Sequence, residues 1–388
     1  MTPGIASSIG LATIEGAQGN VPAIRFAPQS GNLRVMGIVA IMPVGVAIQT
    51  GVIEIGSGYE ASLADVPGNV ILDRIVVRGQ ANNWTRRGLQ FNGHTTAVID
   101  SWVDEIGEPG ADTQAIAGWT GPGPFKIVNN YLAAAGENIM FGGDVGSFPV
   151  TPSDIEIRRN HLHKPNSYRG KWVVKNVFEL KTAARVLMED CVLSGSWQSG
   201  QDGYAIVLKA SAFTGTSDIT IRRILIERVG AGFTLMGIQG AAGGTTRRVL
   251  IEDVTLDISE SGSNRAILMV KDGPEVIEDV TVRRMLVTSS RLTAVWISGE
   301  QSASRMAMID VGSPRGEYGV LGDGMGPGAG AWNRDVAAPR VWSNVYLIGV
   351  PNGTYPPGTT FVSSESAIHF AASIRQTVQQ AIAGVVVP

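Results

Sequence analysis

Two lysines end equivalent short segments of the sequence. Lys181 closes NVFELK and Lys209 closes YAIVLK, and both segments have the alternation of a short β-strand. Glu179 lies two residues before Lys181, on the same side of such a strand. A cation that neutralises a uronate carboxylate makes the C5 proton of the sugar acidic, and a base can then remove it. The candidate bases for this β-elimination are Lys181, Lys209 and His163, with Glu179 as the neighbouring carboxylate.

Aromatic, amide and further cationic side chains take matching places in other short segments. The segments are GLQFNG, AIAGWT, NIMFGG, AILMVK and AVWISG. Aromatic rings offer flat apolar faces with which a sugar ring can pack, and polar side chains beside them fix its orientation. The residues expected to contact a substrate are Asn92, Trp119, Phe141, Lys271 and Trp296.

Two aspartates are candidate ligands of Ca²⁺, which prefers carboxylate and carbonyl oxygens. Asp144 belongs to GGDVGSF and Asp202 to SGQDGYA. Aspartate is equally typical of a glycine-containing turn with no metal, so both interpretations stay open. His161 and His163 would share one side of a strand, but zinc requires more ligands than two. Ca²⁺ is therefore the cofactor considered.

Glycoside hydrolysis is the rival reaction. It requires two carboxyl groups about 5 Å or about 6.5–9.5 Å apart. Asp144, Glu179 and Asp202 are the clustered acids that could supply them, and their spacing in the sequence does not select a pair.

These residues must be positioned by a repeated element. SDIEIRRNHL (153–162) and SDITIRRILI (217–226) agree at six of ten positions. The underlying pattern, with two alternate apolar residues followed by polar ones, recurs in eight segments between residues 70 and 287, spaced by 26 to 33 residues. Such a period indicates a repeat architecture. A second strand-like segment lies between the copies, so each repeat holds at least two strands.

A parallel solenoid of β-coils fits this period better than helical repeats or propeller blades. No 3.6-residue periodicity is present, and a propeller blade needs about 40–45 residues. In a solenoid, Ile157 and Ile221 point inward and equivalent strands stack at about 4.8 Å. The arginines of the two decapeptides, Arg158, Arg159, Arg222 and Arg223, are expected to be solvated on the outer face. Asn130 and Asn160 predict a short asparagine ladder at one corner.

Several stretches resemble bacterial right-handed parallel β-helix repeat proteins of the pectate-lyase-like superfamily. They are QAIAGWTGPGPFKIVNNYLAAAGENIMFGG (114–143), PSDIEIRRNHLHKP (152–165), KNVFELKTAARVLMEDCVLSGSW (175–197) and YPPGTTF (355–361). The resemblance implies an all-β, right-handed parallel β-helix of about ten coils. Its members are mostly uncharacterised, so the activity it implies is a loose one. We expect the β-helix to span residues 1–365, shortened at its N-terminal end, with 366–388 as a capping segment.

Composition excludes several classes of protein. The net charge of −3, with interspersed signs, lacks the basic stripe of a nucleic-acid-binding protein. Cys191 is the one cysteine, which excludes an internal disulfide and a cysteine-based zinc cluster. No run of 18 apolar residues predicts a transmembrane helix. Residues 1–10 do not have the pattern of a signal peptide, so an extracellular or periplasmic location would require a leader that has been removed.

The resulting hypothesis is a secreted β-helix that acts on an acidic, uronate-containing polysaccharide, by lyase-type elimination. A non-catalytic β-helix that binds glycan or forms part of a surface spike is the alternative from another class. Oligomeric state is left open by the sequence.

Overall fold

The computed structural model describes residues 10–147, 149–210, 215–238, 244–271 and 276–385. The chain is an all-β parallel solenoid with a period of about 30 residues, as predicted. It divides into two compact units, each considered by itself below. The N-terminal unit comprises Met1–Leu187 with Gly384–Pro388, and the C-terminal unit comprises Met188–Ala383.

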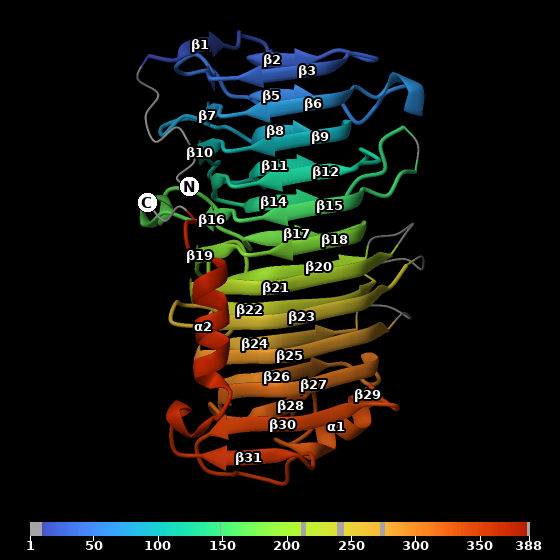
Figure 1. Cartoon of the computed structure of the whole chain (residues 1–388), viewed down its shortest axis with the longest axis vertical. Helices are drawn as coiled ribbons and strands as arrows, with labels where there is room; N and C mark the ends of the chain where they lie inside the picture. Colours follow the sequence, from blue (N-terminus) through green and yellow to red (C-terminus); the bar gives the residue numbers. More distant parts are fainter. Residues whose placement is uncertain (1–9, 148, 211–214, 239–243, 272–275, 386–388) are drawn as a thin grey trace. The chain divides into compact units, whose positions relative to one another are not determined.

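Three parallel ladders build the N-terminal unit (Figure 1). The first contains β3 (Gly31–Met36), β6 (Gly68–Asp73), β9 (His94–Ile99), β12 (Phe125–Val128), β15 (Ser153–Arg158) and β18 (Ala183–Glu189), and the unit boundary falls within β18. The second contains β1 (Ala12–Glu15), β4 (Ile38–Ile41), β7 (Val76–Arg78), β10 (Trp102–Ile106), β13 (Tyr131–Ala134) and β16 (His161–His163). The third contains β2 (Ile24–Phe26), β5 (Ile53–Ile55), β8 (Arg87–Phe91), β11 (Gln114–Gly118), β14 (Glu137–Phe141) and β17 (Phe178–Leu180).

Longer strands form the C-terminal unit. One ladder contains β19 (Val192–Ser196), β21 (Thr216–Val229), β23 (Thr246–Asp257), β25 (Ile277–Ser289), β27 (Ala303–Pro314), β30 (Val341–Ile348) and β31 (Thr359–Val362), and β29 (Val336–Ala337) also pairs with β27. The other contains β20 (Tyr204–Ala210), β22 (Ala231–Ile238), β24 (Arg265–Val270), β26 (Thr293–Ser298) and β28 (Gly319–Gly322). The short helix α1 (Ala329–Asp335) follows β28.

Stacked aliphatic side chains fill the interior of each unit. In the N-terminal unit, Ile127 and Ile157 are in register and have no exposed surface. In the C-terminal unit, Ile221 pairs with Ile251 and both are equally buried. The prediction that the decapeptide isoleucines point inward is confirmed. Each buried aliphatic side chain contributes about 1.5–3 kcal/mol to folding, so the core stabilises the coils without any disulfide.

A short ladder of polar side chains sits at one corner of the N-terminal unit. The backbone N–H and side-chain amide of Asn130 both donate to Oδ1 of Asn160, at 2.9 and 3.0 Å. Asn130 Oδ1 in turn accepts from the backbone N–H of Ser101, at 2.9 Å. Asn130 and Asn160 are almost fully buried, so these bonds replace water for backbone groups at the bend. This part of the predicted asparagine ladder is confirmed.

Charges alternate between successive coils at the strand ends. The residues concerned adopt left-handed backbone angles, with φ of 51° to 60° for Asp218, Arg248, Asp279 and Arg305. Coils in which an aspartate precedes two arginines (D…RR) alternate with coils in which an arginine precedes a glutamate and an aspartate (R…ED). An aspartate of one coil therefore lies beside an arginine of the next coil. The resulting ion pairs include Asp154–Arg185, Asp190–Arg223, Asp218–Arg248, Asp253–Arg284 and Asp279–Arg305.

Two of the decapeptide arginines lie against a buried carboxylate. Arg222 Nε and Arg223 Nη2 both lie 2.6 Å from Oε2 of Glu189, whose side chain has no exposed surface. Arg158 is 39% exposed and lies 2.7 Å from Glu156, in keeping with a solvated outer face. Arg222 and Arg223 keep 38% and 28% of their side-chain surface exposed, as expected for the outer face, but they also neutralise a buried carboxylate, a role that the sequence did not predict.

The C-terminal segment forms helix α2 (Ala371–Ala381), which lies along the side of β21, β23 and β25 (Figure 1). Its buried residues Ile374 and Val378 pack with Leu286, and Phe370 and Ile368 join the same cluster. The helix therefore covers a lateral face of the C-terminal unit, whereas the sequence interpretation placed it over an end of the core. Neither α2 nor another helix of the described ranges is long and apolar enough to cross a membrane.

Candidate functional site

A groove of about 790 Å³ opens on the outward side of the third ladder of the N-terminal unit. Strands β5, β8, β11 and β14 carry its floor, and the turns between strands form its walls. Its lining combines aromatic, cationic and anionic side chains, among them Arg25, Glu54, Tyr59, Glu60, Arg86, Arg87, Gln90, Asp112, Gln114, Trp119, Met140, Asp144 and Lys181.

The strand register explains which predicted residues meet. Gln90, Ala117, Met140 and Glu179 occupy one column across four coils. Two residues further along each strand, the neighbouring column contains Asn92, Trp119 and Lys181, as expected from the sequence. Of these, Trp119 and Lys181 line the groove.

Phe141 does not belong to that face. It pairs with Leu180 and is fully buried, with its ring centroid 5.1 Å from that of Phe125. Phe141 faces outward only if Gly142 of NIMFGG is taken as an inward residue, and that choice displaces this coil by one position. A one-residue slip moves every side chain to the opposite face of a strand. The prediction that Phe141 stacks on a sugar was therefore wrong.

Asn92 is 1% exposed and serves the coil rather than the groove. Its amide oxygen accepts from the backbone N–H groups of Trp119 and Thr120, at 2.8 and 3.3 Å. It thus fixes the backbone that presents Trp119. The indole itself is 7% exposed, and the guanidinium of Arg87 lies 5.0 Å from its ring centroid. The expected substrate contact of Asn92 is replaced by this supporting role.

Three acidic side chains of the groove already have firm partners. Glu54 lies 3.1 Å from Arg25, and Asp112 forms an ion pair with Lys175. The Lys175 ammonium lowers the pKa of Asp112 against the opposing effect of burial. Glu60 accepts hydrogen bonds from the backbone of its own turn, and its side chain is largely buried. These carboxylates therefore shape the groove as members of pairs.

Asp144, a candidate calcium ligand, also has donors on both oxygens. Tyr59 donates to Oδ2 at 2.6 Å, and the backbone N–H groups of Val145 and Gly146 donate to Oδ1. The hydrogen bond from Tyr59 is the main reason why the pKa of Asp144 is lowered. Both oxygens therefore already accept hydrogen bonds, and calcium binding at Asp144 stays a prediction.

Asp202, the other candidate calcium ligand, lies in a turn of the C-terminal unit, where its backbone carbonyl accepts from Ser263. In the described part of the chain, no group of three or more His, Cys, Asp or Glu side chains is placed to hold a metal. Calcium binding at Asp202 stays a prediction.

Two adjacent arginines were missed by the sequence interpretation. Arg87 Nη1 donates to the backbone oxygen of Gln49 at 2.9 Å, and Arg86 Nη1 donates to the Gln49 side chain at 3.4 Å. Among the described residues, neither arginine forms an ion pair with a carboxylate. Burial and the neighbouring Arg86 lower the pKa of Arg87 to about 10. The arginine pair is thus a concentrated positive charge in the groove that would favour an anionic ligand.

Lys181 and Glu179 come together at the other end of the groove. Lys181 Nζ lies 4.0 Å from Glu179 Oε1, as the two-residue spacing predicted. Glu179 is only 1% exposed, so it lies under the groove rather than on its surface. Lys209 is a partly exposed residue of β20 in the C-terminal unit, and its role as a base stays a prediction.

His163 is not among the residues that line the groove. It belongs to β16 in the second ladder, with its ring 5.1 Å from His161 and 6.0 Å from Tyr131. The sequence could not assign His163 to a ladder, because the turn that separates its strand from Lys181 has no fixed length in this pattern. It is therefore not a base for chemistry in this groove.

The remaining candidates form a separate cluster in the C-terminal unit. The Arg265 guanidinium lies 4.0 Å from the ring centroid of Trp296, and the indole N–H donates to Asp323 at 2.9 Å. Lys271 Nζ donates to the backbone oxygen of Glu300 at 3.4 Å. Trp296 and Lys271 thus lie on partly exposed surface with partners of their own, and their contact with a substrate stays a prediction.

Solved structures share this fold at low sequence identity. The catalytic unit of a thermostable GH87 α-1,3-glucanase from Streptomyces thermodiastaticus strain HF3-3 matches with a TM-score of 0.57 and 12% identity, over 89% of this chain and 60% of that one. Pre-mature gene product 12 of bacteriophage phi29 matches with 0.54 and 12%, over 91% and 51%. A family 28 exopolygalacturonase from Yersinia enterocolitica matches with 0.52 and 10%, over 87% and 72%.

These likenesses confirm the parallel β-helix fold expected from the pectate-lyase-like resemblance. The chain spans about 60% of the length of the glucanase unit and about half of the phage protein. No protein-family model matches the sequence, and no curated protein matches it. Because the shared fold hosts enzymes and a phage protein alike, function has to be argued from the groove.

Proposed function

We propose that the groove of the N-terminal unit binds an acidic, uronate-containing polysaccharide. The observation that carries the proposal is the arginine pair Arg86–Arg87, which has no carboxylate partner among the described residues and lies beside Trp119. A uronate carboxylate supplies the charge that this pair lacks. Guanidinium groups bind carboxylates with two parallel hydrogen bonds, which also orients the sugar.

Each groove component then has a chemical role. Arg86 and Arg87 hold the carboxylate, and withdrawal of its charge makes the adjacent C5 proton more acidic. Trp119 lies beside Arg87 in the lining of the groove, and Lys181 is the candidate base that also lines it. In the elimination, the base takes the C5 proton, the C4–O bond breaks, a C4–C5 double bond forms, and the leaving oxygen takes a proton from water. Such a polymer lies outside the cytoplasm, so an extracellular or periplasmic location is part of the proposal.

Binding without cleavage is the second candidate. It is favoured because three acids that line the groove already have partners. Glu54 pairs with Arg25, Asp112 pairs with Lys175, and Asp144 accepts a hydrogen bond from Tyr59. Hydrolysis by a pair of carboxyl groups would need one acid free to protonate the leaving oxygen and another to activate water or attack the sugar. The same pairings make hydrolysis the weaker enzymatic alternative.

The test combines an activity assay with a binding assay. Pectate, alginate and glycosaminoglycans are offered with and without Ca²⁺, and the absorbance of the unsaturated uronide is followed. In parallel, polymer affinity is measured for the parent, for the Arg86→Gln/Arg87→Gln variant and for Arg159→Gln as a matched control. Arg159 is an exposed residue of the same unit that does not line the groove.

We expect the double variant to lose affinity by roughly 10- to 150-fold, since hydrogen bonds to charged groups contribute about 1.5–3 kcal/mol. Arg159→Gln should bind as the parent does. New absorbance supports elimination, whereas binding without absorbance supports the non-catalytic function. If the parent binds none of the acidic polymers, or if the double variant binds as tightly as the parent, the proposal is wrong.

A further inference from the structure

A buried carboxyl and an amide form a pair under the wall of the groove. Glu137 opens β14 and has no exposed surface, while Gln114 opens β11 and lines the groove. Gln114 Nε2 donates to Glu137 Oε2 at 2.7 Å. Glu137 Oε1 and Gln114 Oε1 are both buried and have no hydrogen-bond partner within the described ranges. Two neighbouring acceptors thus lack a donor.

Burial of an unpaired acceptor costs about 1–3 kcal/mol, more if it is charged. A single proton on Glu137 supplies the missing hydrogen-bond donor, so that neither side chain is left with an unpaired acceptor. A protonated carboxyl can donate to the amide oxygen while its carbonyl accepts from the amide N–H, which gives a cyclic pair with two hydrogen bonds.

The charged surroundings of Glu137 agree with this. The groups that act on it or feel its charge are the acids Glu179 and Asp112 and the cations Arg87, Lys164, Lys175 and Lys181. Burial is the largest cause and Glu179 the next in raising the pKa of Glu137 to about 7. Burial lowers the pKa of Lys164 to about 7, and its amine nitrogen is turned to the backbone oxygens of Ala134, Ala135 and Gly136.

We propose that Glu137 is a proton-holding positioning residue, which keeps Gln114 in the groove wall through an acid–amide pair and weakens the binding of anionic polymer when it loses its proton. Ionisation breaks one of the two hydrogen bonds. It also places a negative charge below the wall in which Arg87 binds the substrate carboxylate. The effect on affinity rests on the function proposed above, whereas the protonation of Glu137 does not.

The first experiment follows the proton in the free protein. Side-chain carboxyl carbons of glutamate are observed by ¹³C NMR between pH 4 and 9, in the parent and in Glu137→Gln. We expect one glutamate resonance that titrates near neutral pH in the parent and is missing from the variant. A Glu137 resonance that titrates near the ordinary glutamate value of about 4.3 overturns the inference.

The pH dependence of stability tests whether the pKa of Glu137 is raised on folding. The pKa of Glu137 is raised on folding, so its contribution is complete below its unfolded value of about 4.3 and is lost as the pH rises through about 7. The glutamine variant cannot lose this proton and can form a similar amide–amide pair. The melting temperature of the variant should therefore rise relative to that of the parent as the pH increases from 5 to 8.

The last experiment measures polygalacturonate affinity from pH 5.5 to 8.5. For the parent, we expect a fall of roughly twofold to 17-fold across pH 7, the range for a unit charge at about 10 Å between the dielectric constant of water and the effective value of about 20 for protein. Glu137→Gln should bind with a nearly constant affinity. Glu156→Gln is the matched control, because it removes an exposed carboxyl of β15 that does not line the groove, and it should follow the parent.

The outcomes separate the two proposals. If the parent does not bind polygalacturonate at pH 5.5, the proposed ligand class is wrong, while the NMR titration still decides the state of Glu137. If the parent binds but its affinity is the same at pH 6 and pH 8, or if Glu137→Gln keeps the pH dependence of the parent, Glu137 does not control the groove.

Discussion

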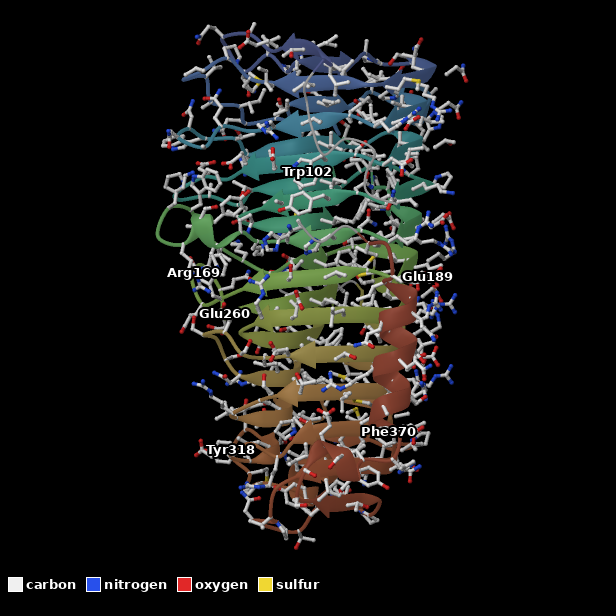
Figure 2. All side chains as sticks on the ribbon, turned by 60° about the vertical axis from the view of Figure 1, so that its left-hand side comes forward. Trp102, Arg169, Glu189, Glu260, Tyr318 and Phe370 are labelled. Carbon is white, nitrogen blue, oxygen red and sulfur yellow. The ribbon has the colours of Figure 1, made fainter. Side chains whose placement is uncertain are left out.

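Replacement of Arg222 by serine is the sharpest test of the buried charge at Glu189. Both Arg222 Nε and Arg223 Nη2 lie 2.6 Å from one oxygen of Glu189. Figure 2 shows Glu189 beside one end of α2, and its side chain has no exposed surface. Such a carboxylate depends on its charged partners more than an exposed one does. We therefore expect Arg222→Ser to lower the free energy of unfolding by about 1.5–3 kcal/mol, the range for a hydrogen bond to a charged group.

The chain contains a matched control for this change. Arg283 Nε lies 2.6 Å from Glu252 Oε1, the same distance as in the Arg222–Glu189 pair, but Glu252 retains 17% exposure. Water can reach that carboxylate once the arginine is removed. Arg283→Ser should therefore lower the free energy of unfolding by only about 0.2–1 kcal/mol, as for other exposed pairs.

Urea unfolding of the full-length chain, followed by tryptophan fluorescence, measures both variants. The same substitution is repeated in a Glu189→Gln background, where the buried charge is gone and Arg222→Ser should cost less than about 0.5 kcal/mol. Equal losses for Arg222→Ser and Arg283→Ser would refute the reasoning. An undiminished loss in the Glu189→Gln background would do the same, because it would assign the effect to packing of the arginine stem.

Two further predictions concern the contacts between coils. Asn160→Ala should lower the free energy of unfolding by about 1–3 kcal/mol, because it leaves the buried backbone N–H of Asn130 without its acceptor, while the Asn130 amide keeps its hydrogen bond to the backbone oxygen of Val98. A loss below about 0.5 kcal/mol in calorimetry would contradict this prediction. Asp218→Arg and Arg248→Asp should each destabilise, while the double exchange should recover most of the loss. A double-mutant cycle with no coupling between the two positions would contradict the proposed charge alternation.

The fold was predictable because its determinants repeat within the sequence. Inward side chains such as Ile157 and Ile221 must be apolar in every coil, so the period is visible from one chain. The solenoid has no competing architecture at a period of about 30 residues with this strand pattern. Residues 366–388 were predicted as a capping segment, but the docking of α2 against β21, β23 and β25 depends on a lateral apolar face that no short-range pattern reveals.

Charge alternation explains a feature that the strand pattern left open. The two decapeptides are separated by two coils, because the pattern D…RR must alternate with R…ED if each aspartate is to meet an arginine. Asp218 pairs with Arg248 of the next coil, and Asp279, which lies one coil further on, pairs in the same way with Arg305 of the coil after it. In parallel stacking, identical charged residues in adjacent coils would repel each other. At these positions the pattern of charged residues therefore repeats after two coils and not after one.

The groove was predictable only where strands build it. The outward place of Trp119 and Lys181 on the groove was predicted correctly, because it follows from alternation along β11 and β17. Gly142 was a poor anchor, since a residue without a side chain does not reveal which face it occupies, and Phe141 was misplaced as a result. The apolar ring belongs in the core, where it is fully buried.

Arg87, Gln114 and Glu137 left a signal that strand alternation could have revealed. They are in register with one another across three coils, two residues before the inward Leu89, Ile116 and Ile139. In three successive coils, a polar residue thus stands where strand alternation predicts a side chain that points into the core. Burial of a polar side chain without a hydrogen-bond partner costs free energy of folding. This arrangement becomes sensible only where the strand leaves a corner and the side chain can turn toward a partner. A site at the wall of a β-solenoid groove should therefore be sought among polar residues that recur in successive coils at positions where strand alternation predicts an inward side chain. Charges on the outward face are a poorer guide.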